Sequence, residues 1–477
     1  MSLRKLATKG LVWTFAQQFG NQFIAFIVSL VLARILLPAE FGLIGMISIF
    51  IAIGNTLLNA GMTQSLIRTE KPDQEDFSTV FYFNLGASII LYFLLYLSAP
   101  LISNFYDREV LTSIIRVYSL TFIISAFSAV QLARLTKIMD FKTQTLIAIP
   151  STIIGGILGV SLAYSGFGVW SLVWSSLATA TISSVQIWIY SKWLPDLSFN
   201  IQKFKEHFHF GYKLTLSGLL NKIFDNSYLL IIGKFFSPAQ VGYYTRAETM
   251  KQLPVTNISN TLNKVTYPLF ASIQGDDMRL KRVYSQLMQM VVFVIAPILI
   301  FIAVLAEPVF RFLFTEKWLP AVPYFQILCF TGILYPVHAY NLNILKVKGR
   351  SDLFLQLEVI KKIIIAITIA IALQFGILVL LYGQVLTSVL AFFINTHYTG
   401  KFLNYSGWEQ TKDILPILLL TAVTATIILV LDYYFLEKYL DIIRILAGGT
   451  TGVLLYLMAS YFLKFESLNE ITKLLKK

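Results

Sequence analysis

Apolar stretches long enough to cross a lipid bilayer recur along the whole chain, and they constrain its fold more than any other feature. Of the 477 residues, 56% are apolar and only 13% are charged, whereas a soluble domain carries about 25% charged residues. Because so few charges cannot cover a globule in water, lipid must surround most of the surface. A spanning helix needs about 20 mainly apolar residues. The sequence therefore predicts an all-α polytopic membrane protein with about fourteen transmembrane helices, at residues 11–34, 41–61, 78–103, 112–133, 143–165, 168–191, 209–235, 241–272, 283–306, 320–346, 354–375, 378–400, 413–433 and 440–463.

The basic residues are distributed as in a membrane protein. The formal net charge is +13, but the Lys and Arg residues lie in short connections between apolar stretches, so no nucleic-acid-binding surface is predicted. Placing the N-terminus in the cytoplasm puts twenty-three Lys and Arg residues in cytoplasmic connections and seven in outer ones. Since cytoplasmic loops carry the excess of Lys and Arg, this asymmetry predicts that both termini are cytoplasmic.

A sequence repeat divides the chain. Residues 34–42, RILLPAEFG, align with residues 234–242, KFFSPAQVG, at an offset of 200 that also superposes Asn21 on Asn221. Each copy closes one predicted helix and opens the next, and six helices separate the copies. An even number of spans leaves both copies in the same orientation, which predicts a parallel repeat around an axis along the membrane normal. Chance similarity of two helix–turn–helix segments is the alternative.

The repeat predicts two lobes of six helices related by a pseudo-twofold axis. The predicted segments are an N-terminal lobe at 1–192, a cytoplasmic inter-lobe loop at 193–208, a C-terminal lobe at 209–402, and two extra helices with a cytoplasmic tail at 403–477.

Ionisable residues at bilayer depth concentrate in the predicted helices 209–235 and 241–272. Each such group costs roughly 2.5–3.5 kcal/mol at the bilayer centre, so it tends to face a cavity or a partner. One stripe along the second helix contains, within about 40° of a single line, Arg246, Leu253, Asn257, Asn260 and Lys264. Because a polar stripe cannot face acyl chains, we predict a wet central cavity. Its predicted polar lining comprises Gln17, Asn21, Asn55, Asn59, Asn221, Asp225, Asn257 and Asn260.

The residues of this cavity predict an anionic, sugar-containing ligand. Arg246, Lys264 and Lys222 would make one wall cationic, which suits a pyrophosphate. Amide side chains both donate and accept hydrogen bonds, which suits sugar hydroxyls. The alternative is that Lys222 and Asp225 neutralise each other at i,i+3, while Arg246 and Lys264 extend to opposite membrane faces.

Two residues are candidates for ion coupling, Asp225 and His338. A lone histidine in a helix is more often a structural hydrogen-bonding residue, and that alternative stays open. The sequence has no phosphate-binding Gly-rich loop with Lys, no paired His ligands and a single cysteine, Cys329, so neither an ATPase nor a metal site is predicted. No cofactor is expected, and an H⁺ or Na⁺ gradient, the membrane potential or downstream use of product would supply energy.

Short motifs run over nearly the whole chain: ARILLPAEFGL at 33–43, VGYYTRA at 241–247, LP at 253–254, KVTYP at 264–268, KWLPAVP at 317–323 and GRSD at 349–352. Together they resemble the polysaccharide transporter family, the Wzx-type flippases for lipid-linked oligosaccharides. This family belongs to the MOP superfamily, with the MATE multidrug exporters and the lipid II flippase. The tyrosine-rich turn before Arg246 is most similar to the branch that handles lipopolysaccharide, exopolysaccharide or teichuronic acid units.

The resemblance implies a carrier with MATE-like lobes that works by alternating access, and not an enzyme. It implies that an undecaprenyl-pyrophosphate oligosaccharide crosses the lipid bilayer of the bacterial inner membrane, from the cytoplasmic to the outer leaflet, with a polysaccharide polymerase as a partner. In that family, basic cavity residues hold the pyrophosphate, and Arg246, Lys264 and Lys222 occupy compatible positions. The first helix carries Gln and Asn where the lipid II flippase has arginines, which argues against lipid II as the substrate. Coupling to H⁺ or Na⁺ is also implied.

Two other classes of protein agree less well with the sequence. A multidrug exporter of the MATE type would need an acidic, aromatic-lined cavity for cationic drugs, whereas the predicted cavity is cationic. A membrane-embedded enzyme that polymerises or ligates glycans would need a large outer loop with catalytic residues, whereas the longest outer connections contain only about a dozen residues.

Overall fold

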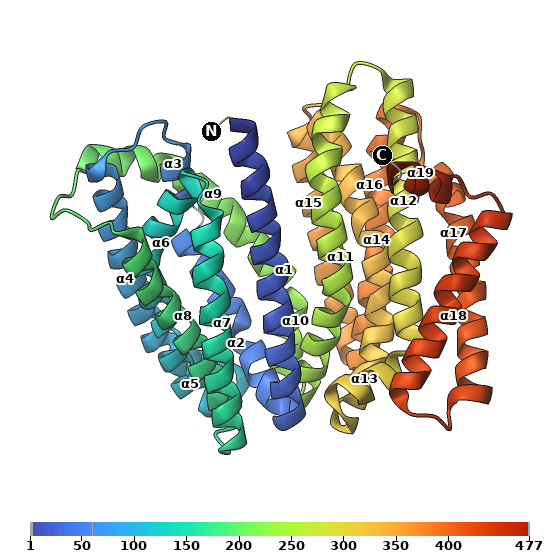
Figure 1. Ribbon diagram of the computed structural model, residues 1–477, viewed down its shortest axis with the longest axis horizontal. Helices are drawn as coiled ribbons and strands as arrows, with labels where there is room; N and C mark the ends of the chain where they lie inside the picture. The colour runs from blue at the N-terminus through green and yellow to red at the C-terminus, as the bar shows by residue number, and fades with distance from the viewer. Residues whose placement is uncertain (1–2, 60, 476–477) are drawn as a thin grey trace. The chain divides into compact units, whose positions relative to one another are not determined.

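The computed structural model describes residues 3–59 and 61–475, with side chains described throughout these ranges except at 3–12, 15, 59, 213–214, 220, 260–265 and 474–475. The described chain is built from helices and contains no strand, which confirms the predicted all-α class (Figure 1). Within that part of the chain, eleven helices are long and apolar enough to cross a membrane. The protein is therefore a polytopic membrane protein.

Each of the fourteen predicted spans overlaps a helix. Three of them, 209–235, 241–272 and 354–375, are not among the eleven apolar helices. The first of them is divided into two helices, Ile201–Asp225 and Ser227–Phe235, and the other two contain charged residues, for example Arg246 in the second and Lys361 in the third. Their helical form is confirmed, and their passage through the bilayer stays a prediction.

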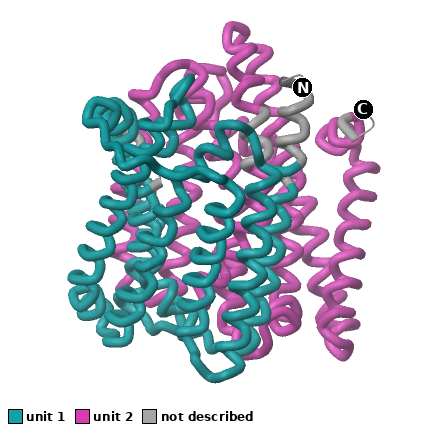
Figure 2. Tube along the Cα trace, turned by 60° about the vertical axis from the view of Figure 1, so that its left-hand side comes forward, with its two compact units in different colours: residues 1–242 teal, residues 243–477 magenta. Residues whose placement is uncertain are grey.

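Contacts divide the chain into two compact units, residues 1–242 and 243–477 (Figure 2). Unit 1 contains α1 (Leu3–Ile35), α2 (Pro38–Asn59), α3 (Met62–Arg68), α4 (Gln74–Tyr106), α5 (Val110–Tyr118), α6 (Leu120–Lys137), α7 (Phe141–Tyr164), α8 (Val169–Ser191), α9 (Ile201–Asp225), α10 (Ser227–Phe235) and the beginning of α11 (Pro238–Ser272). Unit 2 contains the rest of α11 and α12 (Asp277–Val304), α13 (Ala306–Phe314), a 3-10 turn (Glu316–Ala321), α14 (Val322–Val347), α15 (Ser351–Ala372), α16 (Ile377–Leu403), α17 (Gly407–Leu431), a π-helical turn (Asp432–Leu436), α18 (Asp441–Phe462) and α19 (Glu466–Leu475).

The predicted inter-lobe loop, 193–208, is wrong at its C-terminal end. Helix α9 already begins at Ile201 because the side chain of Asn200 caps it, accepting hydrogen bonds from the backbone N–H groups of Gln202 (2.9 Å) and Lys203 (3.2 Å). Helices α9 and α10 pack against α2 and α4 and therefore belong to unit 1. The assignment of transporter lobes to 1–192 and 209–402 stays a prediction.

The two copies of the repeat adopt the same local structure. Helix α2 begins at Pro38 and α11 begins at Pro238, where proline's fixed φ suits the first helical position. In the first copy the carboxylate of Glu40 accepts a hydrogen bond from the Leu37 backbone N–H (2.7 Å). The side chain of residue 240 accepts the equivalent bond from the Ser237 N–H (3.1 Å). The copies differ before this turn, because α1 is continuous where the second copy is divided into α9 and α10.

A buried apolar core in unit 1 positions the first turn of α4. It consists of Met62, Leu66, Val80, Phe81, Val130 and Trp193. The indole Nε1 of Trp193 also donates a hydrogen bond to the Gln74 side chain (2.6 Å). The chain between α8 and α9 is thereby tied to the start of α4.

In unit 2, a buried amide pair connects α14 to α17. The Gln410 Nε2 donates to the Asn341 Oδ1 (3.2 Å), and the Asn341 Nδ2 donates to the Gln410 Oε1 (3.1 Å). The Tyr284 hydroxyl of α12 donates to the same Gln410 oxygen (3.3 Å). Since all three side chains are buried, their hydrogen bonds fix how these helices face one another.

Candidate functional site

Arg246 is buried among aromatic side chains of unit 2. Its side chain is 6% exposed. The guanidinium carbon lies 4.8 Å from the ring centroid of Phe314 and 5.0 Å from that of Trp318, within the range of cation–π attraction. The structure thus places Arg246 against two rings, and its predicted contact with a pyrophosphate requires the guanidinium to reach a ligand from this position.

The predicted stripe along α11 can be followed only as far as Asn257. Leu253 and Asn257 are partly buried, and the Asn257 Nδ2 donates to the Leu253 carbonyl of its own helix (2.8 Å). The side chains of Asn260 and Lys264 lie outside the described residues. The predicted role of Lys264 in pyrophosphate binding therefore stays a prediction.

Three predicted residues lie together at the C-terminal end of α9. Asn221, Lys222 and Asp225 are all exposed. Lys222 occupies the last turn, where the partial negative charge of the helix end favours a cation. The structure thus keeps these side chains accessible to a ligand, and the choice between a pyrophosphate contact for Lys222 and its neutralisation by Asp225 stays open.

The predicted amides of the first two helices differ in their surroundings. Gln17 on α1 is partly exposed and Asn55 on α2 is exposed. The Asn21 Oδ1 accepts a hydrogen bond from the Thr152 hydroxyl (2.5 Å), so this amide links α1 to α7. The side chain of Asn59 lies outside the described residues.

His338 links α14 to α16. Its Nε2 lies 3.2 Å from the Ser388 hydroxyl and its Nδ1 lies 3.3 Å from the Asn395 Nδ2. Because an amide N–H₂ can only donate, Nδ1 accepts from Asn395 and Nε2 carries the proton toward Ser388. This geometry agrees with the structural alternative for His338, and ion coupling by His338 or Asp225 stays a prediction.

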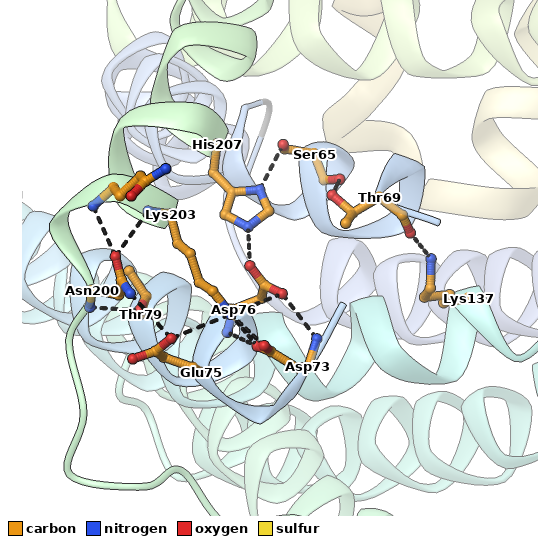
Figure 3. Close-up of polar contacts among 11 residues, drawn as sticks. Ser65, Thr69, Asp73, Glu75, Asp76, Thr79, Lys137, Asn200, Lys203 and His207 are labelled. Atoms are coloured by element: carbon orange, nitrogen blue, oxygen red, sulfur yellow. Dashed lines mark hydrogen bonds and ion pairs between the residues drawn. The ribbon is translucent and has the colours of Figure 1, made fainter. Parts of the chain in front are cut away.

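A polar cluster that the sequence did not predict joins the start of α9 to the start of α4 (Figure 3). We call it the α9 clasp and define it as Asp73, Glu75, Asp76, Lys203 and His207. The Lys203 ammonium contacts the Asp73 carboxylate and lies 3.3 Å from the Glu75 Oε2 and 3.5 Å from the Asp76 Oδ2. One cation of α9 thus binds three carboxylates from the first turn of α4.

His207 extends the clasp toward α3. Its Nε2 lies 3.3 Å from the Asp76 Oδ1 and its Nδ1 lies 2.7 Å from the Ser65 hydroxyl. The ring is buried. Two residues that are 131 positions apart, Asp76 and His207, therefore meet inside unit 1.

The hydrogen bond from Lys203, together with the smaller effect of the Asp76 backbone N–H that Asp73 caps, lowers the pKa of Asp73 from 3.8 to about 2. Because the folded-state pKa is lowered, the stabilisation is present above the ordinary pKa of 3.8 and is lost as the pH falls through about 2. The clasp is therefore intact at neutral pH.

Replacing Lys203 by methionine is expected to loosen the start of α9, because three carboxylates would lose their common cation. Backbone amide exchange at residues 196–207 should become about fivefold faster, equivalent to roughly 1 kcal/mol of local opening free energy. Hydrogen–deuterium exchange measured by mass spectrometry would detect it. Lys205→Met is the matched control, since Lys205 is exposed on the same helix. Equal exchange in both variants would contradict a stabilising role for the clasp.

Comparison with known proteins gives one family match and relatives that align with most of the chain. The model of the family described as "Polysaccharide biosynthesis protein" matches residues 31–323. The teichuronic acid biosynthesis protein TuaB of Bacillus subtilis (strain 168) is 26% identical over 413 residues, which cover 85% of each chain. The lipopolysaccharide biosynthesis protein WzxC of Escherichia coli (strain K12) is 23% identical over 401 residues, covering 83% of this chain and 82% of WzxC.

Solved structures share the fold. The lipid II flippase MurJ in an inward closed conformation aligns with a TM-score of 0.76 and 13% identity, covering 95% of this chain and 99% of MurJ. An inward-facing MATE family transporter of the MOP superfamily aligns with a TM-score of 0.59 and 16% identity, covering 84% of this chain and 94% of the transporter. At these identities the similarity concerns the fold alone.

Proposed function

The chain belongs to the polysaccharide biosynthesis protein family, and on this premise we propose that it is a flippase for lipid-linked oligosaccharides. It moves undecaprenyl-pyrophosphate-linked sugar repeats from the cytoplasmic to the outer leaflet by alternating access, for the synthesis of a surface polysaccharide. The observation that carries the proposal is that proteins named for teichuronic acid and lipopolysaccharide biosynthesis align with more than four-fifths of the chain.

The proposed substrate needs a cationic site and a hydrogen-bonding site. Arg246, Lys264 and Lys222 would hold the pyrophosphate, because charge-assisted contacts to phosphate strengthen where water is excluded. Exposed amides such as Asn55 and Asn221 would accept from and donate to sugar hydroxyls. The ligand would thus be held by its charge and its sugars at once.

The protein acts as a carrier and not as an enzyme in this proposal. It lies in the bacterial cytoplasmic membrane with both termini in the cytoplasm, as the distribution of Lys and Arg predicts. A polysaccharide polymerase on the outer side would consume the translocated repeat. An H⁺ or Na⁺ gradient would drive the cycle, with Asp225 and His338 as the candidate coupling residues.

Uptake into inverted membrane vesicles tests the proposal. A panel of radiolabelled undecaprenyl-pyrophosphate oligosaccharides, carrying teichuronic acid or lipopolysaccharide repeats, would be offered at the cytoplasmic face. We expect one of them to become protected inside vesicles that contain the protein and to stay outside in vesicles that lack it, because a charged headgroup does not cross hydrocarbon unaided. Protection of none, with insertion verified, would contradict the proposal.

A multidrug exporter is the second candidate, and the MATE-like fold favours it. It predicts that deletion of the gene sensitises cells to cationic drugs without changing their surface polysaccharide. The flippase proposal predicts the opposite pattern. A drug-susceptibility panel beside an analysis of surface glycan in the same deletion strain separates the two.

A further inference from the structure

The two copies of the repeat touch each other through glycines. A Cβ atom at Gly42 would lie 1.7 Å from the carbonyl oxygen of Pro238, and a Cβ atom at Gly242 would lie 2.0 Å from the carbonyl oxygen of Pro38. The contact is reciprocal, since each glycine meets the proline of the other copy. No residue with a side chain fits at either position, so the backbones of α2 and the first turn of α11 lie in direct contact.

A second backbone contact lies at the other end of α2. A Cβ atom at Gly61 would lie 2.8 Å from the Gly211 backbone, and a Cβ atom at Gly211 would lie 2.7 Å from the Gly61 backbone. Helix α2 has 22 residues, which corresponds to about 33 Å, close to the thickness of the hydrocarbon core. The two glycine contacts are therefore separated by about one membrane thickness.

The contact at Gly61 is reinforced by the α9 clasp. Lys203, His207 and Gly211 follow one another at intervals of four residues and so lie on one face of α9. Lys203 and His207 bind the start of α4 and α3, and Gly211 touches Gly61 directly beyond them. At the opposite end, Lys234 of α10 pairs with Asp107 after α4 (2.9 Å). Each glycine contact thus has an ion pair close to it along the chain, since Lys203 lies eight residues before Gly211 and Lys234 lies four residues before Pro238.

We propose that these two contacts are the closures of the transport cycle, one at each end of α2, and that one opens while the other stays shut. This inference rests on the proposed function. Backbone contacts between small residues can part and reform without withdrawing a side chain from a packed core. The repeat symmetry pairs Gly42 with Gly242 at the outer closure, whereas Gly61 and Gly211 form the inner closure. Both closures are shut in this structure.

Replacing one of these glycines by alanine adds a Cβ atom that should force one closure apart and leave the other in place. We call these four substitutions the wedge variants. A cysteine at Asn55, an exposed position on α2, reports access in a Cys329→Ala background that removes the only native thiol. Gly42→Ala and Gly242→Ala should each raise its labelling by a membrane-impermeant maleimide from the outer side at least about tenfold. Gly61→Ala and Gly211→Ala should raise labelling from the cytoplasmic side by a similar factor. Right-side-out and inverted vesicles separate the two sides.

Gly86→Ala is the matched control, because a Cβ atom at Gly86 in α4 would meet nothing within 4 Å. It should leave labelling unchanged from both sides. If the four wedge variants increase labelling from both sides alike, the glycines serve packing only and the proposal fails. Unchanged labelling in folded wedge variants overturns it as well.

A second experiment uses no alanine variant, so it tests the inner closure even where such a variant does not fold. Lys203→Met together with His207→Gln releases the clasp and leaves every glycine in place. We expect labelling of the Asn55 cysteine to rise from the cytoplasmic side only, and labelling that stays native would overturn the inner closure. Because labelling needs no substrate, the closures can be confirmed even if the vesicles transport none of the oligosaccharides tested.

Discussion

Replacing Arg246 by methionine is expected to abolish transport of the lipid-linked oligosaccharide while the protein still inserts into the membrane. A charge-assisted hydrogen bond to phosphate contributes about 2–3 kcal/mol, so its loss should slow uptake at least about thirtyfold. Methionine retains an unbranched apolar side chain against Phe314 and Trp318, which lie around the guanidinium. Vesicle uptake of the labelled substrate measures the effect, with the amount of folded protein determined in the same membranes.

Two further variants serve as controls. One separates the charge of Arg246 from its geometry, and the other removes an arginine elsewhere in the chain. Arg246→Lys keeps the positive charge but loses the planar, bidentate geometry, and we expect it to retain a measurable part of the uptake. Arg108→Met removes an exposed arginine in the connection after α4 and should transport normally. Normal uptake by Arg246→Met would show that Arg246 serves only to pack the two rings. If Arg246→Met and Arg246→Lys lost thermal stability to the same extent and uptake to the same extent, that result would also indicate a packing role.

Replacing Arg444 by methionine is expected to destabilise unit 2 more than any other single loss of charge described here. Arg444 of α18 donates from Nε and Nη2 to the two carboxylate oxygens of Asp432 (2.8 and 2.7 Å). Both residues are buried, at 7% and 8% exposure. Removing the arginine leaves a buried carboxylate without this partner, which costs about 3–5 kcal/mol. Thermal unfolding followed by fluorescence-detected size exclusion would report the loss.

The control for this prediction removes both charges. Asp432→Asn combined with Arg444→Met leaves no unpaired ion, so most of the lost stability should return. Lys473→Met breaks an exposed pair with Glu470, in which the lysine side chain is 69% exposed, and should change stability by less than about 1 kcal/mol. A double variant as unstable as Arg444→Met would argue that the pair acts through shape and not through charge compensation.

The helices were predictable from the sequence because most of them appear as continuous apolar runs. An apolar run of about twenty residues has only one way to satisfy its backbone in lipid, which is a helix. The repeat was visible for a similar reason, since Pro38 and Pro238 begin helices through local geometry that neighbouring residues complete. By contrast, the start of α9 was placed too late, because charged residues interrupt residues 201–208 and leave no continuous apolar run there, although Asn200 caps the helix at this point.

The candidate site was predictable only in its composition. Arg246 and Asn257 were identified because ionisable and amide residues are rare in apolar helices. Their partners were not, because Phe314 and Trp318 lie far along the chain and aromatic residues are common in it. The α9 clasp was missed for the same reason. Asp73 and Asp76 indicate a helix start, but nothing local to them points to Lys203.

By itself, then, the sequence determined the all-helical class, the position of the long apolar helices and the repeat, because these follow from interactions between residues close together in the chain. The tertiary structure alone decided that Arg246 packs against two rings, that Lys203 contacts three carboxylates, and that Gly42 and Gly242 meet the carbonyls of Pro238 and Pro38. Such contacts join residues more than sixty positions apart, and their free energy depends on distance and burial, which no local pattern encodes.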